Sequence, residues 1–195
     1  MNRKIERGQA TRGQFIDIAT RLFAEHGYDG TSIDAVLKES GASRGSLYHH
    51  FASKEALFEA VLDRVEAEIG EKVIVAGAGI ADPVEELRAG CLAWMWQAGD
   101  PVVQRIVLVD APSVLGWVRW REIEEAGGLG LLQAALQAVS EAGRLDPELV
   151  DLFAHMMLAA LNEVALLIAR TEDPAEAQRM GETAVDELLG RLLGS

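Results

Sequence analysis

Apolar residues recur at helical spacing near the start of the chain. The positions i, i+3, i+4, i+7 and i+8 of an amphipathic helix are filled by Phe15, Ile18, Ala19, Leu22 and Phe23. His26-Gly27 follows this stripe, and glycine is common just past a helix end. The pattern predicts a first helix over residues 11–26.

Two shorter helices are predicted next, on either side of a tight turn. Thr31 followed by Asp34 is similar to a capping box, in which side-chain oxygens bind free backbone amides at a helix start. Gly41 permits the positive φ of a tight turn, and Ser43 can cap a third helix that begins at Arg44. A short helix, a turn and a second short helix are therefore expected.

The rest of the chain keeps helical spacing between glycine and proline breaks. Ser53 can cap a fourth helix over 54–73, long enough to link two domains. Further helices are predicted over 83–97, 102–109, 115–142, 148–170 and 175–193. No segment alternates with a period of two, so we expect an all-α fold of about nine helices. The N-terminal domain is expected over 1–53 and a C-terminal helical domain over 74–195.

The net charge of −13 is unevenly distributed along the chain. Residues 1–54 hold eight Lys/Arg against six Asp/Glu, a net +2, whereas 55–195 hold ten against twenty-five, a net −15. Any contact with nucleic acid is therefore expected from the first segment, because the acidic remainder repels phosphate. An ordinary imbalance of solvated charge is the alternative. A protein that holds DNA without sequence preference should be basic throughout, which disfavours that class.

Cysteine content and known motifs narrow the chemistry. Cys91 is the only cysteine, so neither an internal disulfide nor a cysteine metal site is expected. The start lacks the apolar run of a signal peptide, and no apolar run of roughly 18 residues follows. GxSxG, P-loop and HExxH motifs are absent. We expect a cytoplasmic protein without cofactor, metal or membrane span, and catalysis is disfavoured.

The third predicted helix is almost entirely polar. Leu47 packs inward, which leaves the outward positions to Arg44, Gly45, Ser46, Tyr48 and His49. Such a helix gains little from burial, so its exposed donors favour a partner, and a helix-turn-helix lays this helix in the major groove of DNA. A polar surface turn remains the alternative. The N-terminal arm is basic and contains Arg3, Lys4, Arg7 and Arg12. It either contacts DNA along the phosphates or the minor groove, or it is a solubilising tail.

This region resembles the TetR family of bacterial regulators. The resemblance rests on Thr31-Ser32-Ile33 and on the run GASRGSLYHHFASKEALF from Gly41 to Phe58. It implies that major-groove contacts come from Ser43, Arg44, Gly45, Tyr48 and His49, and that the DNA backbone is held by Thr31, Ser32 and Lys54. Leu47 and Phe51 match structural positions. Arg44 suits either a guanine or a phosphate contact.

The resemblance further implies a C-terminal ligand-binding domain whose last two helices pair between subunits. Residues 148–170 carry apolar side chains around most of the helix, and 175–193 carry a second apolar set, which favours a homodimer over a buried monomer core. We expect a repressor released from a palindromic operator by a small, largely apolar effector. A ligand-independent or activating regulator of the same fold is the alternative.

Candidate effector contacts are less specific. An apolar pocket is expected from Trp96, Trp117, Trp120, Phe153 and Met156, although such residues are more often plain core. Trp94 is expected in the core. One polar stripe on helix 148–170 consists of Glu148, Asp151, His155 and Asn162. The stripe is either a solvated edge or dimer seam, or it brings His155 and Asn162 into a ligand cavity.

Overall fold

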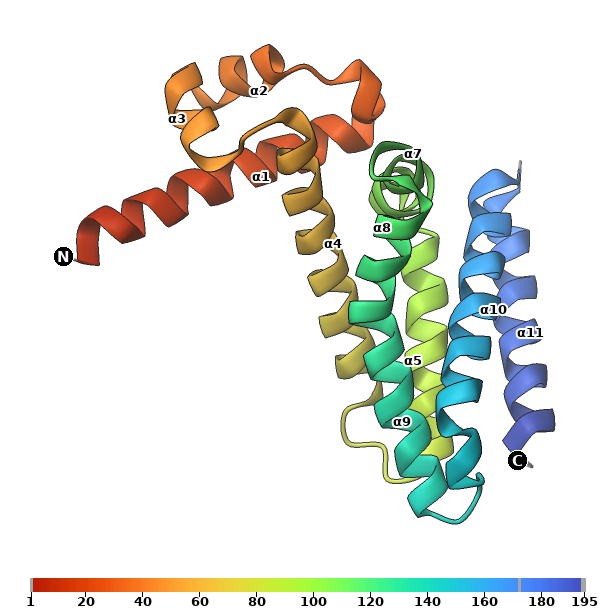
Figure 1. Cartoon of the computed structure of the whole chain (residues 1–195). Coiled ribbons are helices and arrows are strands. Elements are labelled where there is room, and N and C mark those ends of the chain that lie inside the picture. Colours follow the sequence, from red (N-terminus) through yellow and green to blue (C-terminus); the bar gives the residue numbers. More distant parts are fainter. Residues whose placement is uncertain (1, 172, 194–195) are drawn as a thin grey trace.

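The computed structural model describes residues 2–171 and 173–193, with side chains for 8–171, 173 and 175–193. Every regular element in these residues is helical, which confirms the expected all-α class. Three N-terminal helices pack at one end of a helical bundle, and the long helix α4 runs from them into it (Figure 1).

The N-terminal helices are α1 (Asn2–Gly30), α2 (Ile33–Ser40) and α3 (Arg44–His50). Regular geometry in α1 breaks at Gly27, whose φ of 72° lies in the left-handed region, so the predicted end near residue 26 is correct. The predicted start at residue 11 is too late. A shared core is formed by Phe15, Phe23, Val36, Leu47 and Phe58.

Helix α4 (Lys54–Gly77) begins at a cap in which the Ser53 hydroxyl accepts a hydrogen bond from the Ala56 amide at 3.0 Å. Its first half packs on α1 and its second half on α5 (Pro83–Ala98). In α5 the Asp82 carboxylate caps the amides of Val84 and Glu85. One helix therefore takes part in both halves of the molecule.

Residues 101–141 are more continuous than predicted. They form α6 (Pro101–Val103), the π-helical η1 (Gln104–Asp110), α7 (Ala111–Val114), α8 (Gly116–Glu124), the π-helical η2 (Glu125–Leu129) and α9 (Gly130–Glu141). The predicted break at Ala111-Pro112 is wrong, because Pro112 lies in the first turn of α7, where a missing amide costs little. The chain turns instead at Gly116, with φ 77°.

The last elements are η3 (Pro147–Leu149), a 3-10 turn, followed by α10 (Val150–Arg170) and α11 (Pro174–Leu193). They lie side by side in Figure 1, and a Cβ on Gly181 would come within 2.9 Å of Val164 Cγ1. The Arg88 guanidinium ties α5 to α11 through two 2.8 Å hydrogen bonds to Asp186.

Two helical spans, Pro101–Glu141 and Pro147–Arg170, are long and apolar enough to cross a membrane by length and composition alone. Core helices of soluble proteins pass the same test. In this fold both spans pack against neighbouring helices, so they carry no argument for a membrane location.

Candidate DNA interface and ligand cavity

The turn between α2 and α3 is built by two local signals. Gly41, with φ 66° and ψ 9°, ends α2 in the left-handed conformation that glycine adopts most readily. The Ser43 hydroxyl then caps α3 by accepting a hydrogen bond from the Ser46 amide at 3.2 Å. Leu47 and Phe51 are buried, as expected, and anchor α3 on α1.

The outer face of α3 is exposed and polar. The residues placed there are Ser43, Arg44, Gly45, Tyr48 and His49, the set expected to meet the major groove. The Arg44 guanidinium forms an ion pair with Asp34 of α2, and both side chains are largely exposed. This ion pair links the first residue of α3 to α2.

The three residues expected to hold the DNA backbone differ in their placement. Ser32 is exposed and caps α2, accepting a hydrogen bond from the Ala35 amide at 3.1 Å. Thr31 is only 2% exposed, and its hydroxyl lies 2.9 Å from the carbonyl oxygens of Leu22 and Gly27. The cap is therefore Ser32 rather than Thr31, and the Thr31 hydroxyl is turned away from any phosphate.

Lys54 begins α4 with its ammonium 4.0 Å from the ring centre of Tyr28. Of the basic arm, Arg12 has its guanidinium 5.1 Å from the ring centre of Phe51. The side chains of Arg3, Lys4 and Arg7 lie outside the described residues. Lys38, which sequence reasoning did not single out, is exposed in the last turn of α2.

The helical bundle contains a partly open cavity of about 920 Å³, within the usual range for small-molecule sites. Helices α4, α5, α8, α9 and α10 and the segment η2 all contribute to its wall. Most of the lining is apolar and includes Ile69, Leu87, Trp94, Ile123, Leu131, Leu132, Leu158 and Leu161.

Of the seven residues expected to contact an effector, Asn162 alone lines this cavity. Trp96, Trp117 and Met156 are 63%, 62% and 54% exposed, and His155 is also exposed. Trp120 is buried in the core and Phe153 packs against it, while Trp94, expected in the core, lines the cavity. Helical spacing gives the angle between side chains but not which neighbour covers each face.

The polar stripe on α10 divides along its length. Glu148 lies in η3, exposed, and Asp151 is exposed with its carboxylate accepting a 2.7 Å hydrogen bond from Gln133. His155 Nε2 lies 3.9 Å from Asp151. Asn162 is buried and donates a 2.8 Å hydrogen bond to Glu124 Oε2. The expected stripe is therefore a solvated edge at one end and a cavity wall at the other.

Two acidic residues of the cavity were missed. Burial, with a smaller effect of the Asp63 carboxylate, raises the pKa of Glu66 to about 7. Burial, followed by the neighbouring Glu66 carboxylate, raises the pKa of Glu124 to about 8 against the opposing effect of Arg121. A sequence signal existed, because Glu66 stands at the inward helical register of Leu62 and Ile69.

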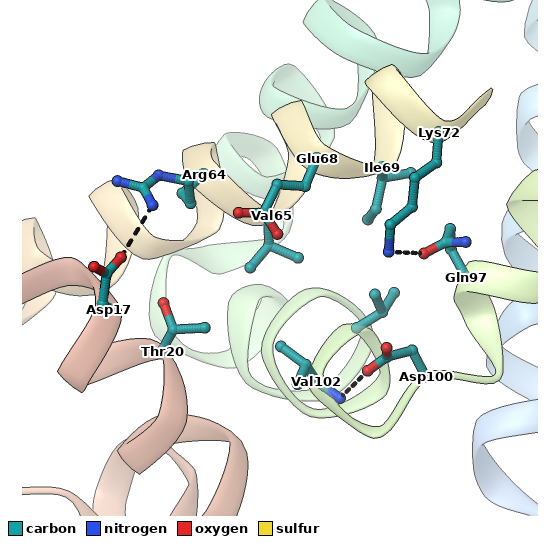
Figure 2. A pocket seen from close by; sticks show the side chains of 11 residues that line it. Asp17, Thr20, Arg64, Val65, Glu68, Ile69, Lys72, Gln97, Asp100 and Val102 are labelled. Carbon is teal, nitrogen blue, oxygen red and sulfur yellow. Dashed lines mark hydrogen bonds and ion pairs between the residues drawn. The ribbon is translucent and has the colours of Figure 1, made fainter. Parts of the chain in front are cut away.

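A second, smaller pocket of about 310 Å³ lies at the junction of the two halves (Figure 2). Asp17 of α1 accepts a 3.0 Å hydrogen bond from Arg64 of α4, and Lys72 donates a 2.6 Å bond to Gln97 of α5. Its lining is polar and charged on several sides. These pairs tie α4 both to the N-terminal helices and to the bundle.

Other polar contacts also join the halves. The Tyr28 amide donates a 2.7 Å hydrogen bond to Asp110 Oδ2 in η1, and the same oxygen accepts one from Arg105 at 3.2 Å. On the other side of α4, Arg119 of α8 donates two hydrogen bonds to Glu59, at 3.0 and 2.6 Å. Because Arg119 also lines the large cavity, the cavity wall is linked to α4 by an ion pair.

Residues 15–61 match the family model described as "Bacterial regulatory proteins, tetR family", and residues 84–192 match "Tetracyclin repressor-like, C-terminal domain". The chain belongs to the TetR family. The helix-turn-helix lies within the first matched segment and helices α5, α8, α9 and α10 lie within the second, whereas the part of α4 that lines the cavity falls between them.

Relatives in this family are similar over much of the chain. The HTH-type transcriptional repressor AcnR of Corynebacterium diphtheriae is 29% identical over 122 residues, which span 63% of each protein. A TetR-family transcriptional regulator from Pectobacterium atrosepticum is 30% identical, covers 97% of both chains and has a TM-score of 0.86. The regulator FadR from Bacillus subtilis, solved in complex with stearoyl-CoA, shares the fold at 21% identity, with 90% and 96% coverage and a TM-score of 0.74.

Proposed function

We propose that this TetR-family chain is a homodimeric regulator that binds a palindromic operator and is released when a small molecule occupies the 920 Å³ cavity. The observation that carries the proposal is the course of α4. This helix begins with Lys54 beside the exposed face of α3 and supplies Glu66, Ile69 and Val73 to the cavity wall. A conformational change at the cavity can therefore shift the start of α4, which lies beside the DNA-binding helix α3. In this proposal residues 1–53 read DNA, and residues 74–195 bind the effector.

DNA contact is assigned to the exposed face of α3 and the caps beside it. Arg44, Tyr48 and His49 present donors and ring edges toward the major groove, while Ser32, Ser43 and Lys54 contact phosphates. The charge distribution supports this orientation, because residues 1–54 carry +2 and the remainder −15. Thr31 takes no part in the proposed contacts, because its hydroxyl is used inside the fold.

Regulation is assigned to the cavity. Relatives are named as transcriptional repressors, and the fold neighbour FadR was solved with stearoyl-CoA, which supports effector-dependent repression. For release, the effector must bind the conformer that cannot bind DNA more tightly than the one that can, by about 1–3 kcal/mol for a typical coupling. By linkage, operator DNA weakens effector binding by the same factor.

Dimerisation is assigned to α10 and α11. Their outer surface exposes Leu152, Met156, Leu167, Met180, Leu188 and Leu192, an apolar set that a partner subunit would cover. Two-fold symmetry then places two α3 helices about one turn of DNA, ~34 Å, or a small multiple apart, which suits a palindromic site. The proposal makes the protein a cytoplasmic regulator rather than an enzyme.

Operator binding is tested first by selecting bound sequences from random DNA with the purified protein. We expect enrichment of a palindrome, and we expect Arg44→Ala and Tyr48→Ala to reduce affinity for it by at least about tenfold, the cost of one good base contact. Arg144→Ala is the matched control, because this arginine follows α9 and lies outside α3 and outside the two helices assigned to the dimer. Circular dichroism of each variant reports the fold.

Two results would overturn the proposal. One is enrichment of no sequence by a folded protein, and the other is equal loss of affinity in Arg144→Ala and in Arg44→Ala. Because phosphate contacts weaken with salt, the logarithm of the binding constant should also fall linearly with the logarithm of the salt concentration.

A further inference from the structure

The large cavity is mostly apolar, but several acidic residues are part of its lining. Among the described residues that line it, the acidic ones are Asp63, Glu66, Glu71, Glu86, Glu122 and Glu124, and the basic one is Arg119. The Arg119 guanidinium is already bound to Glu59 and Glu122. No other described side chain of the lining can neutralise an anionic ligand.

Two of these carboxyls differ from the rest because they are withdrawn from water. Glu66 Oε1 is buried and has no hydrogen-bond partner among the described residues. Glu124, on the facing helix α8, is 5% exposed and held by the Asn162 amide at 2.8 Å. Trp94 Nε1 is likewise buried without a partner, and its indole forms part of the same wall. A buried acceptor and a buried donor without partners are costly unless a ligand satisfies them.

We propose that the effector class is a lipophilic organic cation, held by the Glu66 and Glu124 carboxylates and by the apolar and indole walls of the cavity. This rests on the proposed function, whose effector site it specifies. The cation would approach the unpartnered Glu66 oxygen, and an aromatic face such as that of Trp94 attracts cations in desolvated sites. An anionic ligand of the same shape meets carboxyls and no free cation.

Proton release accompanies this binding. The raised pKa values of Glu66, about 7, and Glu124, about 8, keep much of the pair protonated in the empty cavity near neutral pH. A bound cation favours the ionised carboxylates, so each proton lost on binding goes to solvent. Affinity therefore rises with pH, by up to about tenfold per pH unit for each proton released, until both groups are ionised.

Other ionisable groups surround the two carboxyls. Asp63 lies on α4 with Glu66, and Arg121 and Glu125 lie on either side of Glu124. Helices α9 and α10 supply no ionisable residue to the described lining, and α5 supplies Glu86 with the thiol of Cys91. Burial raises the pKa of Cys91 to about 12, so this thiol stays protonated throughout the range.

The test uses two probes of the same shape and opposite charge, tetraphenylphosphonium and tetraphenylborate, in calorimetric titrations of the full chain. We expect the cation to bind at least about tenfold more tightly than the anion. Repeating the titration in buffers of different ionisation enthalpy should show proton release near neutral pH. Neither probe titrates, so any released proton comes from the protein.

Matched variants separate a cavity carboxylate from general negative charge. Glu66→Gln should weaken cation binding by at least about tenfold and reduce proton release, as should Glu124→Gln. Glu68→Gln removes the same charge from the exposed, opposite side of α4 and should change neither. Because Gln can still accept a hydrogen bond from Asn162, the variants test charge with little change of shape.

Equal or tighter binding of the anion would overturn the assignment. Cation binding whose affinity changes neither with pH nor in Glu66→Gln would also overturn it. The titrations need no DNA, so these results would leave operator binding untouched. Conversely, a protein that selects the cation but enriches no operator would retain the ligand assignment and lose the proposed function.

Discussion

The adjacent hydroxyls of Thr31 and Ser32, just before α2, have different structural roles. Thr31 is buried, and its hydroxyl lies within hydrogen-bond distance of the carbonyl oxygens of Leu22 and Gly27 near the end of α1. Ser32 is exposed and caps α2 through the Ala35 amide. Thr31 therefore stabilises the junction of α1 and α2, whereas Ser32 remains accessible at the surface.

Substitutions at these two residues should both lower stability, by an amount that reflects burial. Thr31→Val removes the buried hydroxyl and its hydrogen bonds and should lower the free energy of unfolding by about 1–3 kcal/mol. Ser32→Ala removes a helix cap and should cost about 1 kcal/mol. Urea unfolding measures both, and Thr31→Ser, which keeps the hydroxyl, is the control. A Thr31→Val protein as stable as the parent would contradict the buried role.

The cavity carboxyls make stability depend on pH. The pKa of Glu124 is raised from 4.5 to about 8 in the folded chain, so between these values the folded state keeps a proton that the unfolded state loses. Its contribution to stability is full below about pH 4.5 and declines as pH rises through about 8, by up to about 1.4 kcal/mol per pH unit.

Comparing urea unfolding of the parent with Glu124→Gln isolates this contribution from the other charges. The difference in unfolding free energy between the two should shift in favour of the variant as pH rises from about 5 to about 8. A difference that stays constant across this range would show that Glu124 is not protonated in the folded chain.

Sequence reasoning at the scale of residues succeeded where local structure decides exposure. The short polar helix around Tyr48 has one apolar contact point, Leu47, so its outer face follows from the sequence. Trp96 and Trp117 could not be placed in this way. Their exposure depends on which distant helix covers them, and that information is not local in the sequence.

At the scale of elements, the joint between α1 and η1 links the two halves of the molecule. Gly27 adopts φ 72° at the end of α1, and a Cβ there would clash with the guanidinium of Arg105. Arg105 and the Tyr28 amide both bind Asp110, whose side chain is nearly buried. Glycine is therefore required for the backbone, and an added Cβ would also force the Arg105 guanidinium to shift.

A pair of glycine substitutions within α1 tests this joint. Gly27→Ala should destabilise the protein by about 1–2 kcal/mol or more, because alanine is strained at positive φ. Gly13→Ala lies in the helix, with no other group within 4 Å of the added Cβ, and should stabilise by up to about 1 kcal/mol. Thermal unfolding of both variants gives the comparison, and a neutral Gly27→Ala would contradict the joint.

Helix positions were predictable where caps and periodicity agree, as for α2, α3 and α5. The segment from Pro101 to Glu141 was not, because its π-helical stretches η1 and η2 keep the backbone helical past residues that usually end a helix. Gly127 and Gly128 lie inside η2, and the helix predicted over 115–142 runs through them. Packing against α1, α4 and α10 decides the outcome there.

On the scale of the whole molecule, acidic, basic and apolar side chains are concentrated in different regions. The acidic residues concentrate after residue 54, while the described N-terminal helices carry exposed basic and polar groups on α2 and α3. Apolar side chains gather instead on the outer surface of α10 and α11. An acidic protein with an uncovered apolar face of this kind needs a partner for it, and a second copy presents the same face.

A charge introduced into this face should therefore separate the proposed dimer. In Met156→Glu, two-fold symmetry would place two carboxylates in the apolar seam, and each unpaired buried charge costs about 3 kcal/mol or more. Sedimentation velocity should show the monomer, and operator affinity should fall because a single subunit contacts one half-site. Val75→Glu is the control, since this exposed apolar residue near the end of α4 lies away from α10 and α11. A dimer that survives Met156→Glu but dissociates in Val75→Glu would place the interface elsewhere.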